Sequence, residues 1–399
     1  MRVPRESPVA PGNEDELLDE ALRKAGRARF LDGSFVEPLR VLLGSLAAAP
    51  LNAAGRFSMR ARIVDLLVNR LRLEDYLDRH PEIHAEEIVA PCIVVGLPRT
   101  GTTMLHRLLS CDPNVTTLAW WESRNPTPFP DTKWNAADPR VAAARVQVQA
   151  ILAAAPQLAT MHPWDAEGPD EEFFLLEHSF YTFYSTVPVL MPAYASWAAT
   201  QDQTVAYRYL RLMLQFLQWQ KRQAGRLRKR WVLKAPRHLG FMEYLFRVFP
   251  DARIVQTHRD PVETIPSIAS LYYAMWQMVG DEIDPRLVGA WSQAHWAEAL
   301  RHCMRVRDAT PAGRFIDIDF RAQVRDAIGE VRRIYQFLGL ELSADTERQM
   351  RWWVEENRRD KRAPHEYTLD MFGLTAEGLR SSFAEYRRRY IAPNGVGRK

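Results

Sequence analysis

The sequence has few cysteines, the residues that mark many metal sites and the disulfide-bonded proteins of oxidising compartments. Only three cysteines occur among 399 residues, Cys92, Cys111 and Cys303, and none belongs to a C-x-x-C pair. Three cysteines are an odd number, and they are widely spread without the spacing of a metal site, so neither a zinc site nor a disulfide framework is expected. This scarcity favours a reduced cytoplasm, and we predict no bound metal.

Long hydrophobic runs are also missing. A membrane-spanning helix needs about 18 to 20 apolar residues. The nearest run, Val41 to Ala54, is interrupted by Gly44, Ser45, Pro50 and Asn52. The proline-rich amino terminus lacks the apolar core of a signal peptide. We expect a protein with no transmembrane segment, for which peripheral contact with a membrane stays open.

There is no surplus of one charge. The 53 basic and 49 acidic residues give a net charge of +4, so a nucleic-acid partner is not expected from the total. One basic run, Lys221 to Arg230, is either a solvated connection or a contact for an anionic surface.

Two regions differ in pattern along the chain. Residues 1–85 comprise a polar tail followed by helical patterns, including apolar residues at helical spacing between Met59 and Leu77. Residues 86–399 alternate strand and helix patterns. We predict that the first region packs on the α/β domain formed by the second.

Short apolar segments in the second region indicate strands, at Cys92–Val95, Trp231–Lys234, Arg253–Thr257 and Arg314–Ile318, with a further short one through Leu118 and Ala119. Helical patterns separate them, which favours right-handed parallel crossovers. The fold class expected is α/β, with a parallel sheet of four to five strands, as in phosphate-loop proteins, flanked by helices.

The most informative stretch follows the first of these strands. Gly96 to Thr103, called the phosphate loop here, fits the pattern G-x-x-x-x-G-K-[ST] except that Thr102 stands at the lysine position. In nucleotide triphosphatases that lysine reaches the outer phosphates, so its absence argues against cleavage of ATP or GTP. Arg99 supplies a positive charge inside the loop instead. The pattern predicts a phosphate site of another kind.

Pro-Arg-Thr-Gly-Thr-Thr after an apolar strand resembles the 5′-phosphosulfate loop of the sulfotransferases, which use 3′-phosphoadenosine 5′-phosphosulfate (PAPS) as donor. The likeness is to bacterial members with this loop, and in part to tyrosylprotein sulfotransferases. It implies donor contacts from the loop residues Arg99, Thr100, Gly101, Thr102 and Thr103.

Two more segments carry the resemblance. Lys234, at the end of a strand, is similar to the lysine that neutralises the leaving group in these enzymes. Arg259 and Ser267 have the eight-residue separation of the family's 3′-phosphate site, about two helical turns. A basic carboxyl-terminal segment closes over that phosphate in the family, which makes Lys361 or Arg362 a candidate contact.

The acceptor hydroxyl needs a general base. Glu122 resembles, within about two positions, the glutamate of the tyrosylprotein branch. His238 follows Lys234 by four residues, whereas the cytosolic branch places its histidine two residues after the lysine. We favour Glu122 over His238, and Asp170 or Glu171 is a weaker third choice.

The acceptor itself is not specified. The aromatic-rich stretch Phe173 to Trp197 is either core or the wall of a hydrophobic acceptor pocket. The hypothesis is sulfuryl transfer from PAPS to a small-molecule or lipid hydroxyl. Its rivals are a kinase-like phosphotransferase and a non-catalytic nucleotide-binding protein. The oligomeric state cannot be read from the sequence.

Overall fold

The structure is a computed structural model, and it describes residues 13–130, 132–156, 158–161, 164–183, 191–357 and 367–391. Its centre is a five-stranded sheet with the order β2-β3-β1-β4-β5, in which all neighbouring strands run parallel. The strands are β1 (Cys92–Val95), β2 (Val115–Thr116), β3 (Arg230–Lys234), β4 (Arg253–His258) and β5 (Phe315–Asp319). This architecture confirms the predicted fold class.

The sheet is buried on both faces because its side chains alternate between two cores. Cys92 and Val94 of β1 pack into a cluster with residues of three helices on one face: α4 (Thr102–Leu109), α15 (Ala327–Leu338) and α16 (Ala344–Glu356). Ile93 and Val95 point into the larger core on the other face. A strand covered on both sides needs a continuous apolar run, which explains the Cys-Ile-Val-Val sequence.

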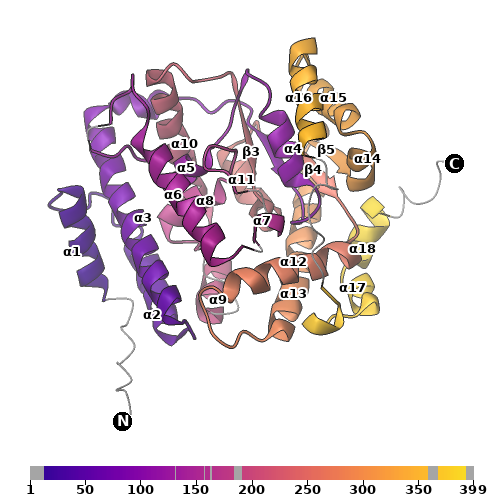
Figure 1. The fold of residues 1–399 in the computed structure, drawn as a ribbon, viewed down its shortest axis with the longest axis horizontal. Coiled ribbons are helices and arrows are strands. Elements are labelled where there is room, and N and C mark those ends of the chain that lie inside the picture. The colour runs from indigo at the N-terminus through magenta and orange to yellow at the C-terminus, as the bar shows by residue number, and fades with distance from the viewer. Residues whose placement is uncertain are drawn as a thin grey trace, which may run out of the picture.

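The larger core is built by helices from the amino-terminal region and from the middle of the chain. Figure 1 shows the strands in the middle of the molecule, the amino-terminal helices along one side and the carboxyl-terminal helices along the other. The elements that contribute to this side of the sheet include α3 (Ala53–Arg79), α10 (Thr204–Gln223), α11 (Met242–Val248), α12 (Pro261–Trp276) and α13 (Pro285–Asp308).

The remaining elements are shorter or lie around these layers. They are α1 (Glu14–Ala25), α2 (Val36–Ala48), α5 (Trp120–Arg124), α6 (Pro139–Ala154), α7 (Leu158–Met161), α8 (Phe173–Leu176), α9 (Pro192–Thr200), α14 (Phe320–Arg325), α17 (Ala376–Ser382) and α18 (Ala384–Tyr386). Single turns lie at Pro81–Ala85, Glu177–Ser179, Pro236–Gly240, Asp370–Phe372 and Arg387–Ile391.

The amino-terminal region is helical as predicted. Leu17 of α1 and Leu67 of α3 belong to the same hydrophobic cluster as Ile254 of the sheet, so these helices pack on the α/β core. The proposed division between residues 85 and 86 stays a prediction. Lys361 and Arg362 lie outside the described residues. Among those described, no helix is both long and apolar enough to cross a membrane.

Candidate active site

The phosphate loop is shaped by backbone conformations that most residues avoid. Gly96 has φ 153°, and a Cβ there would lie 2.2 Å from the Thr257 hydroxyl oxygen. Gly101, with φ 88°, precedes the first turn of α4, and Arg99 is held at φ 70°. The first amides of a helix have no intrahelical acceptor, so this loop and helix can receive an anion.

The threonines of the loop have different surroundings. Thr100 is buried, its hydroxyl donates to the carbonyl of Leu97 at 2.6 Å, and it lies 2.6 Å from the Thr257 hydroxyl. Thr100 therefore holds the loop in place. Thr103, on the first turn of α4, instead faces the neighbouring strand β3.

Lys234 meets the loop from the end of β3. Its Nζ lies 3.3 Å from the hydroxyl of Thr103, and it also contacts the carboxylate of Glu171. The Lys234 side chain is only 3% exposed. Water therefore screens its charge little, and the cation is directed at the loop.

The two candidate 3′-phosphate residues meet at Arg99. Nε of Arg99 donates to the Ser267 hydroxyl at 3.2 Å, while Arg259 donates to the Arg99 carbonyl at 3.1 Å. Arg259 also pairs with Glu263 at 3.0 Å, one helical turn along. Asp260 caps α12 through the amide of Val262 and so fixes the start of the helix that carries Ser267. The eight-residue spacing thus brings both side chains to the loop.

Glu122 lies on a helix rather than after the predicted strand, because β2 ends at Thr116 and the chain turns into α5. Its carboxylate accepts from the amide of Ala119 at 2.9 Å and pairs with the ammonium of Lys221. The capping contact explains the helix: residue 122 satisfies an amide that the first turn leaves without a partner. Glu122 is 2% exposed.

His238 is fully buried in a chain of hydrogen bonds. Its Nδ1 lies 2.8 Å from the hydroxyl of Tyr207, and its Nε2 lies 2.8 Å from the carboxylate of Glu172. The other oxygen of Glu172 accepts from the backbone amide of Lys234 at 2.8 Å. This arrangement fixes the end of β3.

Sequence reasoning gave little weight to the acidic run at residues 170–172, although the structure brings two of its carboxylates to Lys234. Glu171 contacts the ammonium, and Glu172 binds the backbone amide. Burial raises the pKa of Glu171, against the opposing effect of Lys234. Burial also opposes ionisation of Glu172, but the contact with His238 holds its pKa below the ordinary value. The sequence feature that could have pointed to these carboxylates is the run of three acidic residues directly before the aromatic residues of α8.

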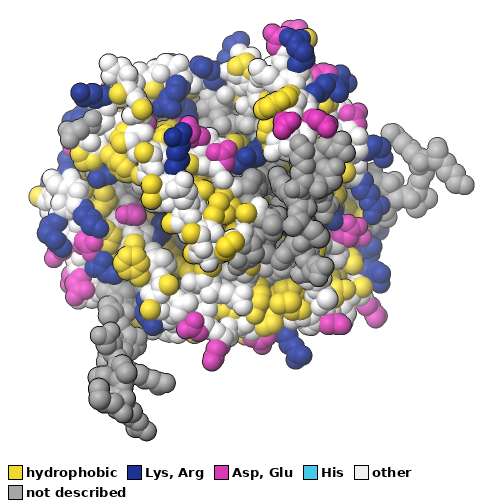
Figure 2. Space-filling view, viewed as in Figure 1, with side chains coloured by type: hydrophobic (Ala, Val, Ile, Leu, Met, Phe, Trp, Pro, Cys, Tyr) yellow, Lys and Arg dark blue, Asp and Glu magenta, His cyan; other side chains and the backbone are white. Residues whose placement is uncertain are grey.

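A cavity of about 490 Å³ lies next to this acidic run, and we call it the aromatic cavity. Its lining is largely aromatic and aliphatic, and includes Phe174, Phe183, Tyr194, Trp276, Trp291 and Trp296. Arg124 also lines it, with its guanidinium 3.1 Å from the centre of the Phe174 ring and 3.6 Å from the carboxylate of Asp170. In Figure 2 hydrophobic side chains gather on the face that carries α8 and α12.

Residues of the aromatic stretch contribute both to the core and to the lining of the aromatic cavity, and the acceptor-pocket role of that cavity stays a prediction. Phe173 and Phe180 are buried in the main core. Phe174 and Tyr194, from the same stretch, line the aromatic cavity.

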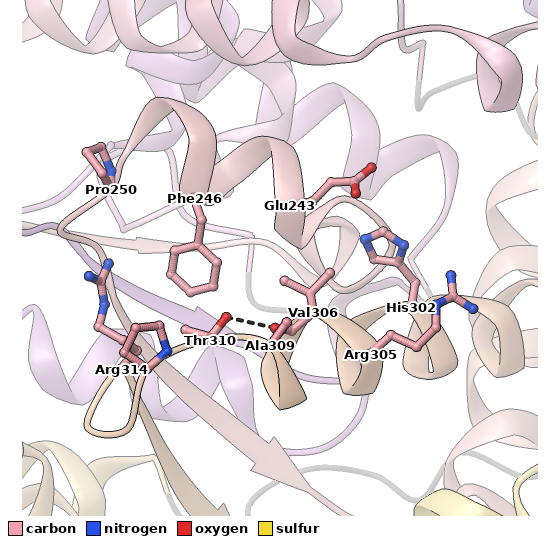
Figure 3. Close-up of a pocket in the computed structure, with 10 residues that line it drawn as sticks. Glu243, Phe246, Pro250, His302, Arg305, Val306, Ala309, Thr310 and Arg314 are labelled. Atoms are coloured by element: carbon pink, nitrogen blue, oxygen red, sulfur yellow. Dashed lines mark hydrogen bonds between the residues drawn. The ribbon is translucent and has the colours of Figure 1, made fainter.

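A second cavity, of about 660 Å³, lies near the amino ends of β4 and β5 (Figure 3). Its lining includes Phe246, Pro250 and Arg314. It contains none of the predicted site residues. Across the described parts of the chain, no group of three or more His, Cys, Asp or Glu side chains is arranged to hold a metal ion.

Comparison with known proteins gives one family. Residues 91–344 match the sulfotransferase family. Two curated relatives, from Mycobacterium bovis and Mycobacterium tuberculosis, are named omega-hydroxy-beta-dihydromenaquinone-9 sulfotransferase Stf3. Each is 28% identical over 270 residues, which cover 64% of this chain and 65% of the relative. The match thus spans slightly less than two thirds of those relatives.

Solved structures are similar over nearly the whole chain. Sulfotransferase STF9 from Mycobacterium avium has a TM-score of 0.84 and 29% identity, with 98% of each chain covered. Sulfotransferase STF1 from Mycobacterium tuberculosis has a TM-score of 0.80 and 30% identity, with 94% of this chain and 99% of the other covered.

Proposed function

The chain belongs to the sulfotransferase family, and we propose that it moves a sulfuryl group from PAPS to a hydroxyl group on an apolar acceptor. The observation that carries this proposal is the 3.3 Å contact between the Lys234 ammonium and Thr103 of the phosphate loop. Transfer leaves negative charge on the 5′-phosphate, and a fixed cation beside the loop stabilises that charge.

The donor fits the residues present. The loop amides and Arg99 would hold the 5′-phosphosulfate, and Gly96 lets the loop pack closely against Thr257 and Thr100, which a Cβ would prevent. Arg259 and Ser267 would hold the 3′-phosphate, since guanidinium and hydroxyl donors both suit that group. Lys234 would stabilise the departing phosphate oxygen. These fixed cations supply the charge that a metal provides in phosphotransferases, so the mechanism proposed uses no metal.

The acceptor we propose is a lipid-like alcohol. The aromatic cavity offers about 490 Å³ of largely apolar space, and apolar ligand sites are of this size and character. The name of the curated relatives specifies a hydroxylated dihydromenaquinone, which is an acceptor of this chemical class. A lipid acceptor also fits peripheral contact with a membrane. All three cysteines are free thiols, in keeping with the cytoplasmic location proposed.

Glu122 and His238 stay predictions for the general base. Both ring nitrogens of His238 are hydrogen-bonded, so this histidine would have to give up one partner to accept a proton. The carboxylate of Glu122 has one contact on each oxygen, to the amide of Ala119 and to the ammonium of Lys221.

Two measurements test the proposal. Adenosine 3′,5′-bisphosphate should stabilise the protein against heat, whereas ATP with magnesium should not; at 100 times the dissociation constant the expected gain is about 2.7 kcal/mol. PAPS should then sulfate an ω-hydroxylated isoprenoid quinone in detergent micelles, with glycerol as the hydrophilic control. Stabilisation by ATP alone would favour the phosphotransferase rival. Binding of the bisphosphate without transfer to any hydroxyl would favour the non-catalytic one.

A further inference from the structure

The three carboxylates at residues 170–172 differ in what surrounds them. Asp170 accepts from the hydroxyl of Ser123 at 2.7 Å and so braces α5. Glu172 is tied to His238 and to the backbone of β3. Only the middle carboxylate, that of Glu171, has a charged group of the proposed donor site as its partner.

Glu171 contacts the cation beside the phosphate loop, and a residue three positions further on lines the aromatic cavity. The cation is the Lys234 ammonium, which reaches Thr103 of the loop. Three residues further on, the amide of Phe174 donates to the backbone carbonyl of Glu171 at 3.4 Å, and Phe174 lines the cavity. Glu171 is thus in contact with the cation at the loop and lies within one turn of the cavity wall.

We propose that Glu171 is the general base of the reaction, held inactive by Lys234 until the donor draws the lysine away. The inference rests on the sulfotransferase function proposed for this site. The sequence favoured Glu122 over His238 and left Asp170 or Glu171 as a weaker third choice.

Glu171 takes the proton of the acceptor hydroxyl as the acceptor oxygen forms its bond to sulfur. The bond from sulfur to the bridging oxygen of the 5′-phosphate breaks, and its electron pair stays on that oxygen. Lys234 stabilises the new charge. The products are the sulfate ester and adenosine 3′,5′-bisphosphate, with a protonated Glu171.

The surroundings of Glu171 suit this role. Its side chain is 15% exposed, and burial raises its pKa. The groups that face it are Lys234 from β3, Arg124 from α5, and its neighbours Asp170 and Glu172. Lys234 is the largest influence favouring the charged carboxylate. When the lysine turns to the donor, the carboxylate loses that support and becomes more basic.

Proton uptake on ligand binding tests the release of Glu171 without any acceptor. Calorimetry of adenosine 3′,5′-bisphosphate binding in buffers of different ionisation enthalpy gives the number of protons taken up. On the acid limb of its pH profile, the wild-type protein should take up more protons than the Glu171→Gln variant. Glu167→Gln is the matched control, because Glu167 is about half exposed and pairs with Arg145 at the surface; it should behave like the wild type.

Turnover tests the base itself. With PAPS and the hydroxylated quinone, Glu171→Gln should lose about 100-fold or more in kcat, the range expected for a general base. It should also lose the acid limb of the pH profile. Glu171→Asp keeps a carboxylate and should recover part of the activity together with that limb. Binding of the bisphosphate shows that each variant is folded.

Two results would overturn the inference while leaving the proposed function in place: turnover of Glu171→Gln within about threefold of wild type, against the 100-fold expected, or equal proton uptake by the two proteins. Failure of the wild-type protein to bind the bisphosphate at all would refute the sulfotransferase proposal as well, so the two failures are distinguishable.

Discussion

Replacing Lys234 removes the cation proposed to stabilise the leaving group. Lys234→Met keeps much of the side chain's volume and loses only its charge and donors, so it separates electrostatics from packing. Loss of one preorganised donor to a developing oxyanion reduces kcat by about 100- to 1,000-fold, or about 3–4 kcal/mol. The side chain is 3% exposed, so little solvent is available to replace it.

The same substitution leaves Glu171 without its partner. Breaking a buried ion pair costs about 3–5 kcal/mol when one charge remains. Glu171 is 15% exposed and its pKa is already raised by burial. It can therefore take up a proton, which makes this range an upper bound. Adding Glu171→Gln to Lys234→Met should recover stability without recovering turnover.

The assay compares kcat at saturating PAPS with the affinity for adenosine 3′,5′-bisphosphate and with the free energy of unfolding in urea. Affinity should change by less than about tenfold, because the loop and the other cations remain. If kcat of Lys234→Met stays within about threefold of wild type, Lys234 does not stabilise the leaving group, because loss of such a donor should cost about 100-fold or more. A loss of turnover that the double variant reverses would also refute the assignment.

Three further substitutions test other parts of the account. Gly96→Ala places a methyl group 2.2 Å from the Thr257 hydroxyl and should lower both thermal stability and bisphosphate binding. Its control Gly44→Ala, where a Cβ meets nothing within 4 Å, should lower neither. Arg259→Met should weaken the binding of adenosine 3′,5′-bisphosphate by about 10- to 100-fold, the value of a charge-assisted hydrogen bond. An equal loss of affinity for AMP, which lacks the 3′-phosphate, would show that the arginine acts elsewhere. Ala198→Trp places a bulky ring in the aromatic cavity and should raise KM for the quinone but not for a short alcohol, whereas equal effects on both would move the acceptor site elsewhere.

The sequence predicts best those parts of the site whose shape depends on residues close together in the chain. The apolar strand, the two glycines and the helix start lie within a few positions of one another, so the loop's shape follows from local chemistry. Arg259 and Ser267 lie on one strand-to-helix junction, and their spacing places both at the loop.

Contacts between distant segments could not be predicted in this way. Glu122 meets Lys221, which is 99 positions away, and Glu171 meets Lys234 at a separation of 63. A local pattern specifies neither pairing. Which carboxylate faces the lysine depends on how α5 and α8 pack against the sheet, and the sequence therefore left several bases open.

The central claim is sulfuryl transfer from PAPS. It is tested most directly by incubating the protein with PAPS labelled in the sulfuryl group and a micellar ω-hydroxylated quinone, without nucleoside triphosphate. The account predicts that the label moves to the lipid fraction as adenosine 3′,5′-bisphosphate accumulates, and that Lys234→Met reduces this transfer by about 100-fold or more. Transfer of the γ-phosphate of ATP to the same acceptor, with no movement of the sulfuryl label, would contradict it.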